Sequence, residues 1–185
     1  MVRDTRFLGL SLNIFALVRT ALLIIVVVAS LIIFVGVPLP VSGNSMVPNF
    51  QSGELVVVEK LSYWSDKPIK RGDVVAAKFP ADPQKTRLIK RVIGLPGELI
   101  EYRDQTFYID HKKLLEGYDI TAGEPPYQEL TTVLLKSDEY FLVGDNRPGS
   151  SDSRLWGAAQ RQDIQGRVAF VLFPIANIRY IDRFL

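Results

Sequence analysis

Cysteine is absent from this sequence of 185 residues, and histidine occurs once, as His111. The chain therefore has no disulfide framework and no thiol nucleophile, and it has few ways to bind zinc. His111 stands in the polar run Asp110-His111-Lys112, where a turn is expected. Lysine is thus the main remaining candidate for a base that activates a nucleophile.

An excess of charge of one sign is also missing. The net charge is +2, and the chain after residue 19 carries equal numbers of acidic and basic residues. A nucleic-acid binder usually has a basic excess, so we expect no nucleic-acid partner. Apart from an apolar block near the N-terminus, the length corresponds to about one folded domain.

One long apolar run is present, at residues 21–37, with no charge and only Ser30 as a polar side chain. As a helix it reaches roughly 26 Å, close to the hydrocarbon thickness of a bilayer. A cleaved export signal is the alternative, but such signals have shorter apolar regions that end in small residues, whereas Pro38 and Pro40 follow here. We therefore expect a retained membrane anchor over residues 20–38.

The charges on either side of this run indicate its orientation. Three arginines precede it, and the first charge after it is Glu54. By the positive-inside rule, residues 1–19 are expected in the cytoplasm and residues 39–185 on the extracytoplasmic side. The predicted location is the cell membrane, with a single span.

Short apolar or alternating runs separated by Gly and Pro predict a mostly β domain after the anchor. The runs expected to form strands are 54–59, 73–79, 88–93, 140–143 and 167–173. Residues 99–139 are expected to form an insertion that contains a hairpin, whose two arms flank residues 110–112.

The apolar run 168–174 has two interpretations. A strand covered on both faces is the favoured one, because such strands show no alternation. The alternative is that Phe170 or Phe173, with Trp64 or Trp156, forms an apolar surface at the lipid interface.

Two polar residues have unusual surroundings. Ser45 lies in the run Gly-Asn-Ser-Met-Val-Pro at 43–48, although such a serine most often only bonds a turn. Lys90 could belong to a solvated basic face, but Leu88 and Val92 are expected on the same face of a strand. Burial there would lower its pKa by roughly three units from about 10.4, which suits a general base near neutrality.

A third polar segment completes a pattern. Residues 144–154 are rich in turn formers, hydroxyls and charges. Together with 43–50, 72–75 and 90–98 they form four ordered boxes, on which the chain resembles bacterial type I signal peptidases, the membrane-anchored serine proteases that remove export signals. In this resemblance residues 43–50 are the nucleophile box, 72–75 a strand box, 90–98 the lysine box and 144–154 the final box. The resemblance covers nearly the whole chain and implies a signal-peptidase-like antiparallel β domain of two sheets behind one N-terminal transmembrane helix.

The resemblance implies a role for each matching residue. Ser45 would be the nucleophile, Lys90 the general base, and Ser150 a hydroxyl that orients the lysine amine. The backbone amide of Ser45 would donate to the oxyanion. The residues implied to brace the site are Asp145, Asp152, Arg91 and Arg154.

Two positions of the nucleophile box bear on activity. Some family members place a serine at the position of Gly43, where its hydroxyl supplements the oxyanion hole, and that contribution is not expected here. Asn49 replaces the usual Thr of Ser-Met-x-Pro-Thr and leaves the bonding of the loop open. Nucleophile and base are unaffected, so an active enzyme is favoured over a catalytically impaired relative that acts in binding or assembly at the membrane.

In the implied reaction, neutral Lys90 takes the proton of Ser45, an acyl-enzyme forms, and water releases it without a metal or organic cofactor. The expected partners are secretory preproteins with signal peptides, paired in extended form with a strand edge, and the lipid bilayer. Two shallow pockets would accept the small residues of a cleavage site. Candidate wall residues are Met46, Phe50, Leu88 and Ile89. A self-cleaving repressor-type Ser-Lys protease shares this chemistry, but the anchor argues against it.

Overall fold

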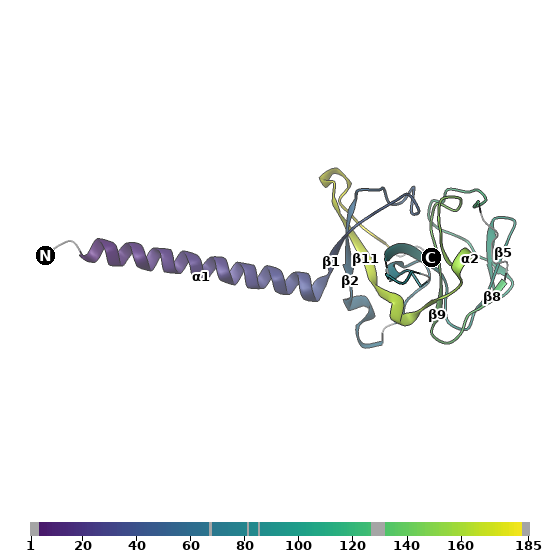
Figure 1. Cartoon of the computed structure of the whole chain (residues 1–185), viewed down its shortest axis with the longest axis horizontal. Coiled ribbons are helices and arrows are strands. Elements are labelled where there is room, and N and C mark those ends of the chain that lie inside the picture. Colours follow the sequence, from purple (N-terminus) through teal and green to yellow (C-terminus); the bar gives the residue numbers. More distant parts are fainter. Residues whose placement is uncertain (1–3, 67, 81, 85, 127–131, 183–185) are drawn as a thin grey trace. The chain divides into compact units, whose positions relative to one another are not determined.

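The structure, a computed structural model, describes residues 4–66, 68–80, 82–84, 86–126 and 132–182 (Figure 1). It divides into two units, residues 1–36 and residues 37–185. Parts of the expected layout lie outside the described residues: 1–3 of the cytoplasmic segment, 127–131 of the insertion, and 67, 81, 85 and 183–185 of the expected β domain.

The first unit is one helix, α1 (Asp4–Val35). Its large apolar side chains between Ile14 and Val28 are exposed. Within the part of the chain that the structure describes, no helix has the length and apolarity needed to cross a membrane.

The second unit is built on antiparallel strands, as the alternating runs predict. Its main sheet has eight strands in the order β1-β2-β11-β3-β4-β9-β10, with β12 paired to β11. Their bounds are β1 (Val37–Pro40), β2 (Leu55–Glu59), β3 (Val74–Lys78), β4 (Arg87–Gly94), β9 (Glu139–Val143), β10 (Ala159–Gln160), β11 (Ile164–Phe173) and β12 (Arg179–Tyr180). The five expected strands correspond to β2, β3, β4, β9 and β11, so the mostly β prediction is confirmed. β1 begins inside the range expected for the anchor.

A second sheet has four strands in the order β7-β6-β5-β8. Its strands are β5 (Leu99–Arg103), β6 (Thr106–Ile109), β7 (Lys112–Lys113) and β8 (Thr132–Leu134). Short helices link the strands of the unit: η1 (Leu61–Asp66), α2 (Ser153–Trp156), η2 (Arg161–Asp163) and η3 (Ile175–Asn177).

The expected hairpin around residues 110–112 is only part of this second sheet. Two turns occur instead of one, at Asp104-Gln105 and at Asp110-His111, and all four turn residues have positive φ between 47° and 66°. Left-handed turns without glycine leave a weak sequence signal, which is why the first turn was missed. His111 is a turn residue, as expected, and its Nδ1 lies 2.9 Å from a carboxylate oxygen of Glu101.

Apolar side chains on opposite faces of β3 belong to different core clusters. Val74 and Ala76 pack into the first cluster with residues of β2 and β11, whereas Val75 and Ala77 pack into the second with residues of β4 and β9. The central strands of the main sheet are therefore covered on both faces, and polar side chains on these strands are shielded from solvent.

The end of β11 differs from the expectation of burial on both faces. Val168 and Val171 are fully buried, but Phe170 and Phe173 are 43% and 55% exposed. The expectation was wrong for these aromatic residues, because only one face of this end of the strand packs on the core. Trp156 packs against the second cluster, and the side chain of Trp64 lies outside the described residues.

Candidate active site

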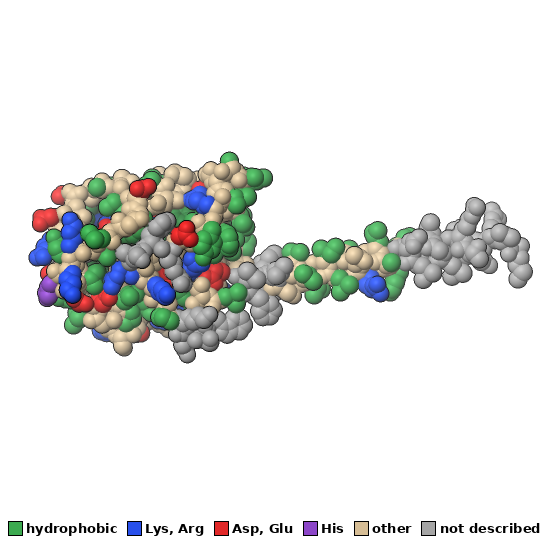
Figure 2. All heavy atoms as spheres, turned by 180° about the vertical axis from the view of Figure 1, so that it is seen from behind, with side chains coloured by type: hydrophobic (Ala, Val, Ile, Leu, Met, Phe, Trp, Pro, Cys, Tyr) green, Lys and Arg blue, Asp and Glu red, His purple; other side chains and the backbone are tan. Residues whose placement is uncertain are grey.

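Acidic and basic side chains are interspersed over the face of the second unit seen in Figure 2. Several more are buried, although burial of a charge is costly unless the charge is paired. Those in the lysine box and the final box with an exposed fraction of 2% or less are Lys90, Arg91, Asp145, Arg147, Asp152 and Arg154. Two boxes that are far apart in sequence thus share one buried polar cluster.

Lys90 is held in this cluster by β4, where it lies opposite Val75 of β3. Its Nζ donates a hydrogen bond to Ser150 Oγ over 3.0 Å. Burial lowers the pKa of the Lys90 amine from 10.5 to about 8, and the negative charges of Asp152 and Asp145 oppose this shift. At this pKa about one lysine side chain in ten is neutral at pH 7, so Lys90 can accept a proton.

Ser45 lies in the turn between β1 and β2 and is partly buried. Its carbonyl oxygen accepts a hydrogen bond from the backbone N–H of Asn146 over 3.0 Å. A Cβ on Gly144 would collide with both this carbonyl oxygen and Ser150 Oγ. Glycine is therefore required at 144, where the turn that holds Ser45 meets the hydroxyl that bonds Lys90.

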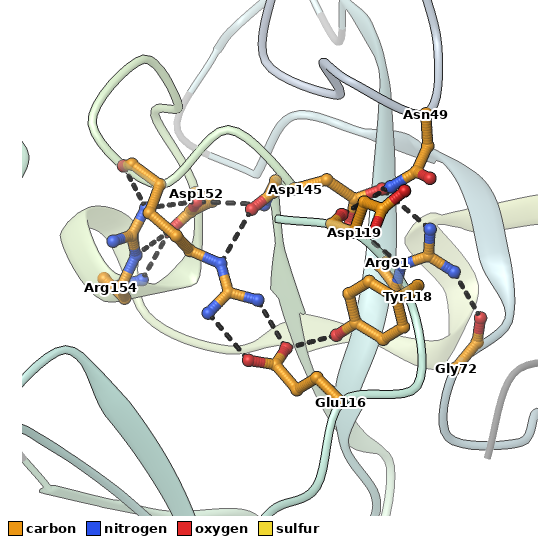
Figure 3. Close-up of polar contacts among 11 residues, drawn as sticks. Asn49, Gly72, Arg91, Glu116, Tyr118, Asp119, Asp145, Asp152 and Arg154 are labelled. Atoms are coloured by element: carbon orange, nitrogen blue, oxygen red, sulfur yellow. Dashed lines mark hydrogen bonds and ion pairs between the residues drawn. The ribbon is translucent and has the colours of Figure 1, made fainter. Parts of the chain in front are cut away.

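Arg91 and Asp145 form a buried ion pair beside this meeting point (Figure 3). Nε and Nη2 of Arg91 donate to the two carboxylate oxygens of Asp145 over 2.8 and 2.7 Å. Nη1 of Arg91 donates to the carbonyl oxygen of Gly72 over 3.1 Å. Such a two-point pair fixes both orientation and distance, so β4 and the start of the final box are held together.

Asp152 and Arg154 form a second buried pair, which shapes the far end of the final box. Nε and Nη2 of Arg154 donate to Asp152 over 2.9 and 2.8 Å. Asp152 also accepts from the backbone N–H of Gly144 over 3.0 Å and caps α2. The carboxylate therefore ties the two ends of residues 144–152 into a closed loop.

Asn49 replaces the usual threonine of the nucleophile box without leaving the loop unbonded. Its Nδ2 donates to Asp145 Oδ2 over 2.8 Å and to the carbonyl oxygen of Asp119 over 2.7 Å. The Asn49 side chain therefore links the turn that carries Ser45 to the Arg91–Asp145 pair.

The four candidate pocket residues have different surroundings. Met46, Phe50 and Ile89 are buried in the first core cluster, whereas Leu88 is partly exposed. A hollow of about 320 Å³ along β1, β2 and β3 has other residues in its lining, including Leu39, Val58 and Ala76.

Sequence reasoning missed the contribution of residues 116–121, which follow the second hairpin. Glu116 pairs with the buried Arg147, and the ring of Tyr118 lies 3.8 Å from the Arg91 guanidinium. The one signal in the sequence was Arg147 itself, since an arginine inside a buried box requires an acidic partner.

The family model for signal peptidase, peptidase S26, matches residues 14–173. A probable signal peptidase I-1 of Synechocystis sp. is 35% identical over 164 residues, which cover 84% of this chain and 82% of that protein. A signal peptidase I of Bacillus licheniformis is 36% identical over 171 residues, which cover 88% and 90%.

A crystal structure of a signal peptidase I from Enterococcus faecalis V583 is 32% identical, covers 56% of this chain and 98% of that chain, and has a TM-score of 0.47. Because the family model and the two relatives match most of its length, the chain belongs to the type I signal peptidases of peptidase family S26, and it is a hydrolase of that family.

Proposed function

We propose that this protein is a membrane-bound serine endopeptidase that removes N-terminal signal peptides from exported preproteins, with Ser45 as nucleophile and Lys90 as general base. One observation carries the proposal: Lys90 is buried, has a lowered pKa, and bonds the Ser150 hydroxyl beside the Ser45 turn. Family membership supports the substrate class.

In the proposed reaction the neutral amine of Lys90 takes the proton of Ser45 Oγ as that oxygen attacks the scissile carbonyl. Lys90 then gives the proton to the leaving amine, and the acyl-enzyme on Ser45 remains. Water, deprotonated by Lys90, releases the acyl group and regenerates the serine. One N–H of the amine donates to Ser150, which leaves the lone pair free to face Ser45.

The oxyanion of the tetrahedral intermediate requires donors that are fixed before reaction. The Ser45 backbone N–H supplies one in this proposal. Its turn is anchored by bonds from Asn146 to the carbonyl oxygens of Ser45 and Asn44, each 3.0 Å long. The ion pairs of Arg91 and Arg154 hold the final box in place by the contacts described above.

An extended substrate segment would lie along the edge of the main sheet in this proposal. β1 is the first strand in the sheet order. The hollow beside it is lined by the apolar residues Val37, Leu39, Val58 and Ala76 and by the polar residues Lys60, Lys78, Arg87, Gln162 and Gln165. Backbone pairing with β1 would place alternate small side chains of the substrate toward the hollow.

Retention at a membrane is part of the proposal. The apolar sequence 21–37 supports an anchor. A second feature is an exposed apolar group around β11, η3 and β12, which suits contact with lipid. Its members are Phe170, Leu172, Phe173, Ile175, Ile178 and Tyr180, with exposed fractions from 42% to 77%.

Incubation of the detergent-solubilised protein with a preprotein tests the function. We expect release of the mature chain, and N-terminal sequencing of the product should locate the cut after a small residue. If the folded protein binds preprotein and leaves it intact, the peptidase proposal is wrong and a role in binding or assembly takes its place.

The rate of cleavage should depend on pH through Lys90. Because the neutral amine is the active form, kcat/KM is expected to rise about tenfold per pH unit below the pKa of the free enzyme and to level off above pH 8. The measurement is the initial rate at preprotein concentrations well below KM between about pH 6 and 10. A rate that keeps climbing toward about pH 10.4, where an unshifted lysine titrates, would contradict this assignment.

A further inference from the structure

Residues 116–121, here called the bridging segment, contact both loops of the proposed site. The backbone of Thr121 accepts from Arg147 and donates to Asp145, each over 3.0 Å. Its hydroxyl donates to the carbonyl oxygen of Val47 over 3.3 Å. The segment therefore joins the final box to the turn that carries Ser45.

The side chain of Glu116 makes the strongest of these contacts. Its two carboxylate oxygens accept from Nη1 of Arg147 over 3.0 Å and from Nη2. The hydroxyl of Tyr118 donates to the same carboxylate, as Figure 3 shows. Burial alone would lower the pKa of Arg147, but the hydrogen bonds and charge of Glu116 raise it above its usual value. Glu116 thus supplies the counterion of a buried guanidinium and fixes its position.

Arg147, held in place by Glu116, in turn contacts Gly144. Its Nε donates to the carbonyl oxygen of Gly144 over 3.2 Å, and Gly144 lies against Ser150 Oγ and the Ser45 carbonyl oxygen. Without Glu116, a guanidinium that is 2% exposed would lose its counterion and have to find other acceptors or water. Such a shift would move Gly144, and with it the hydroxyl that bonds Lys90.

We propose that Glu116 is a positioning residue for the peptidase reaction, acting through Arg147 to hold Gly144 at the point where the Ser45 turn, Ser150 and Lys90 meet. This inference rests on the proposed function. It assigns a part in the reaction to the bridging segment, which lies outside the four sequence boxes.

The test compares Glu116→Gln with Glu101→Gln in the detergent-solubilised full chain. Glu101 is a matched control because it loses the same charge on the second sheet, where it contacts only the exposed ring of His111 among the side-chain partners described. For Glu116→Gln we expect kcat per folded enzyme to fall about 10- to 100-fold with KM changed by less than about twofold. Glu101→Gln should match the wild type. Equal kcat in the two variants would overturn the proposal.

The pH dependence of the cleavage rate distinguishes a positioning role of Glu116 from a general destabilisation of the fold. The charged groups acting on Lys90 are Asp152, Arg154 and Asp145, and none of them is replaced. If Ser150 is displaced, the ammonium loses an acceptor and the profile of Glu116→Gln moves to lower pH. Movement upward toward about pH 10.4 would mean that water reaches Lys90, and would contradict a positioning role.

Two further measurements keep the inference testable. Tyr118→Phe removes one hydrogen bond to Glu116 and retains the ring over Arg91. A smaller fall in kcat, about two- to fivefold, is therefore expected for this variant even if Glu116→Gln fails to fold. Wild-type kcat in Tyr118→Phe would count against the positioning role.

An NMR titration of the Lys90 side chain requires no substrate. A lower Lys90 pKa in Glu116→Gln and not in Glu101→Gln supports the positioning even if the wild type cleaves no preprotein, whereas identical titrations or a raised Lys90 pKa argue against it.

Discussion

Replacing Ser45 with alanine is expected to lower the turnover of preprotein by about four orders of magnitude or more. The reason is that no acyl-enzyme can form without the Ser45 hydroxyl, and residual rate would come only from binding and the oxyanion donor. The turn itself should persist, because its bonds from Asn146 involve backbone carbonyl oxygens. Single-turnover cleavage at saturating enzyme measures the effect.

Ser42→Ala is the matched control for this substitution. Ser42 lies in the same loop and is exposed, so its loss should leave turnover within about twofold. Both variants should retain a free energy of unfolding within about 1 kcal/mol of the wild type. Normal turnover in Ser45→Ala with the loop intact would rule out Ser45 as the nucleophile.

The second large effect is expected for Lys90→Met, which should abolish turnover and still stabilise the fold. Methionine fills a similar volume without a charge. Lowering the pKa from 10.5 to about 8 corresponds to a cost on the order of 3 kcal/mol for burying the charged amine. Loss of the bond to Ser150 offsets about 1 kcal/mol of this gain. We therefore expect a variant more stable by about 2 kcal/mol at pH 7, with kcat reduced about 10⁴-fold.

The difference in stability between wild type and Lys90→Met should itself depend on pH. Because the pKa of Lys90 is lower in the folded chain than in the unfolded chain, the free-energy cost of burying the charged amine is present in full below pH 8. Between pH 8 and 10.5 the unfolded chain holds a proton that the folded chain has released, so wild-type stability rises with pH and the difference narrows. Chemical denaturation in detergent at several pH values measures this. Lys113→Met, at an exposed position of β7, should show no such trend.

Local patterns in the sequence predicted much of the fold. Alternating and continuous apolar runs placed β2, β3, β4, β9 and β11, because the period of side chains along a strand depends only on neighbouring residues. The same reasoning missed the turn at Asp104-Gln105 and predicted burial for Phe170 and Phe173, which are exposed. Which face of a strand end is covered depends on segments that arrive from elsewhere in the chain.

Around the candidate site, too, the sequence indicated the residues, whereas the structure was needed to show their contacts. Ser45, Lys90 and Ser150 could be named from their boxes, and the apolar neighbours of Lys90 already predicted a lowered pKa. The bonds of Asn49 to Asp119 and Asp145 span 70 and 96 positions of the chain, and a change of residue type at 49 carries no information about such partners. The sequence therefore left the bonding of Asn49 open, and only the packed loops of the structure showed its partners.

The sequence by itself narrowed the chemistry that is open to this protein: the chain has no cysteine and one histidine, and its resemblance to signal peptidases singled out Ser45 and Lys90 as the proposed nucleophile and base. The tertiary structure decided how the pKa of Lys90 is lowered and which contacts hold the turn that carries Ser45 against residues 144–146. Burial of Lys90 between covered strands, the pairing of Arg91 with Asp145, and the bridge from Glu116 through Arg147 to Gly144 all depend on folding. The physical reason is that residue types and local periodicity are properties of short segments, whereas desolvation and buried ion pairs arise only when distant segments exclude water together.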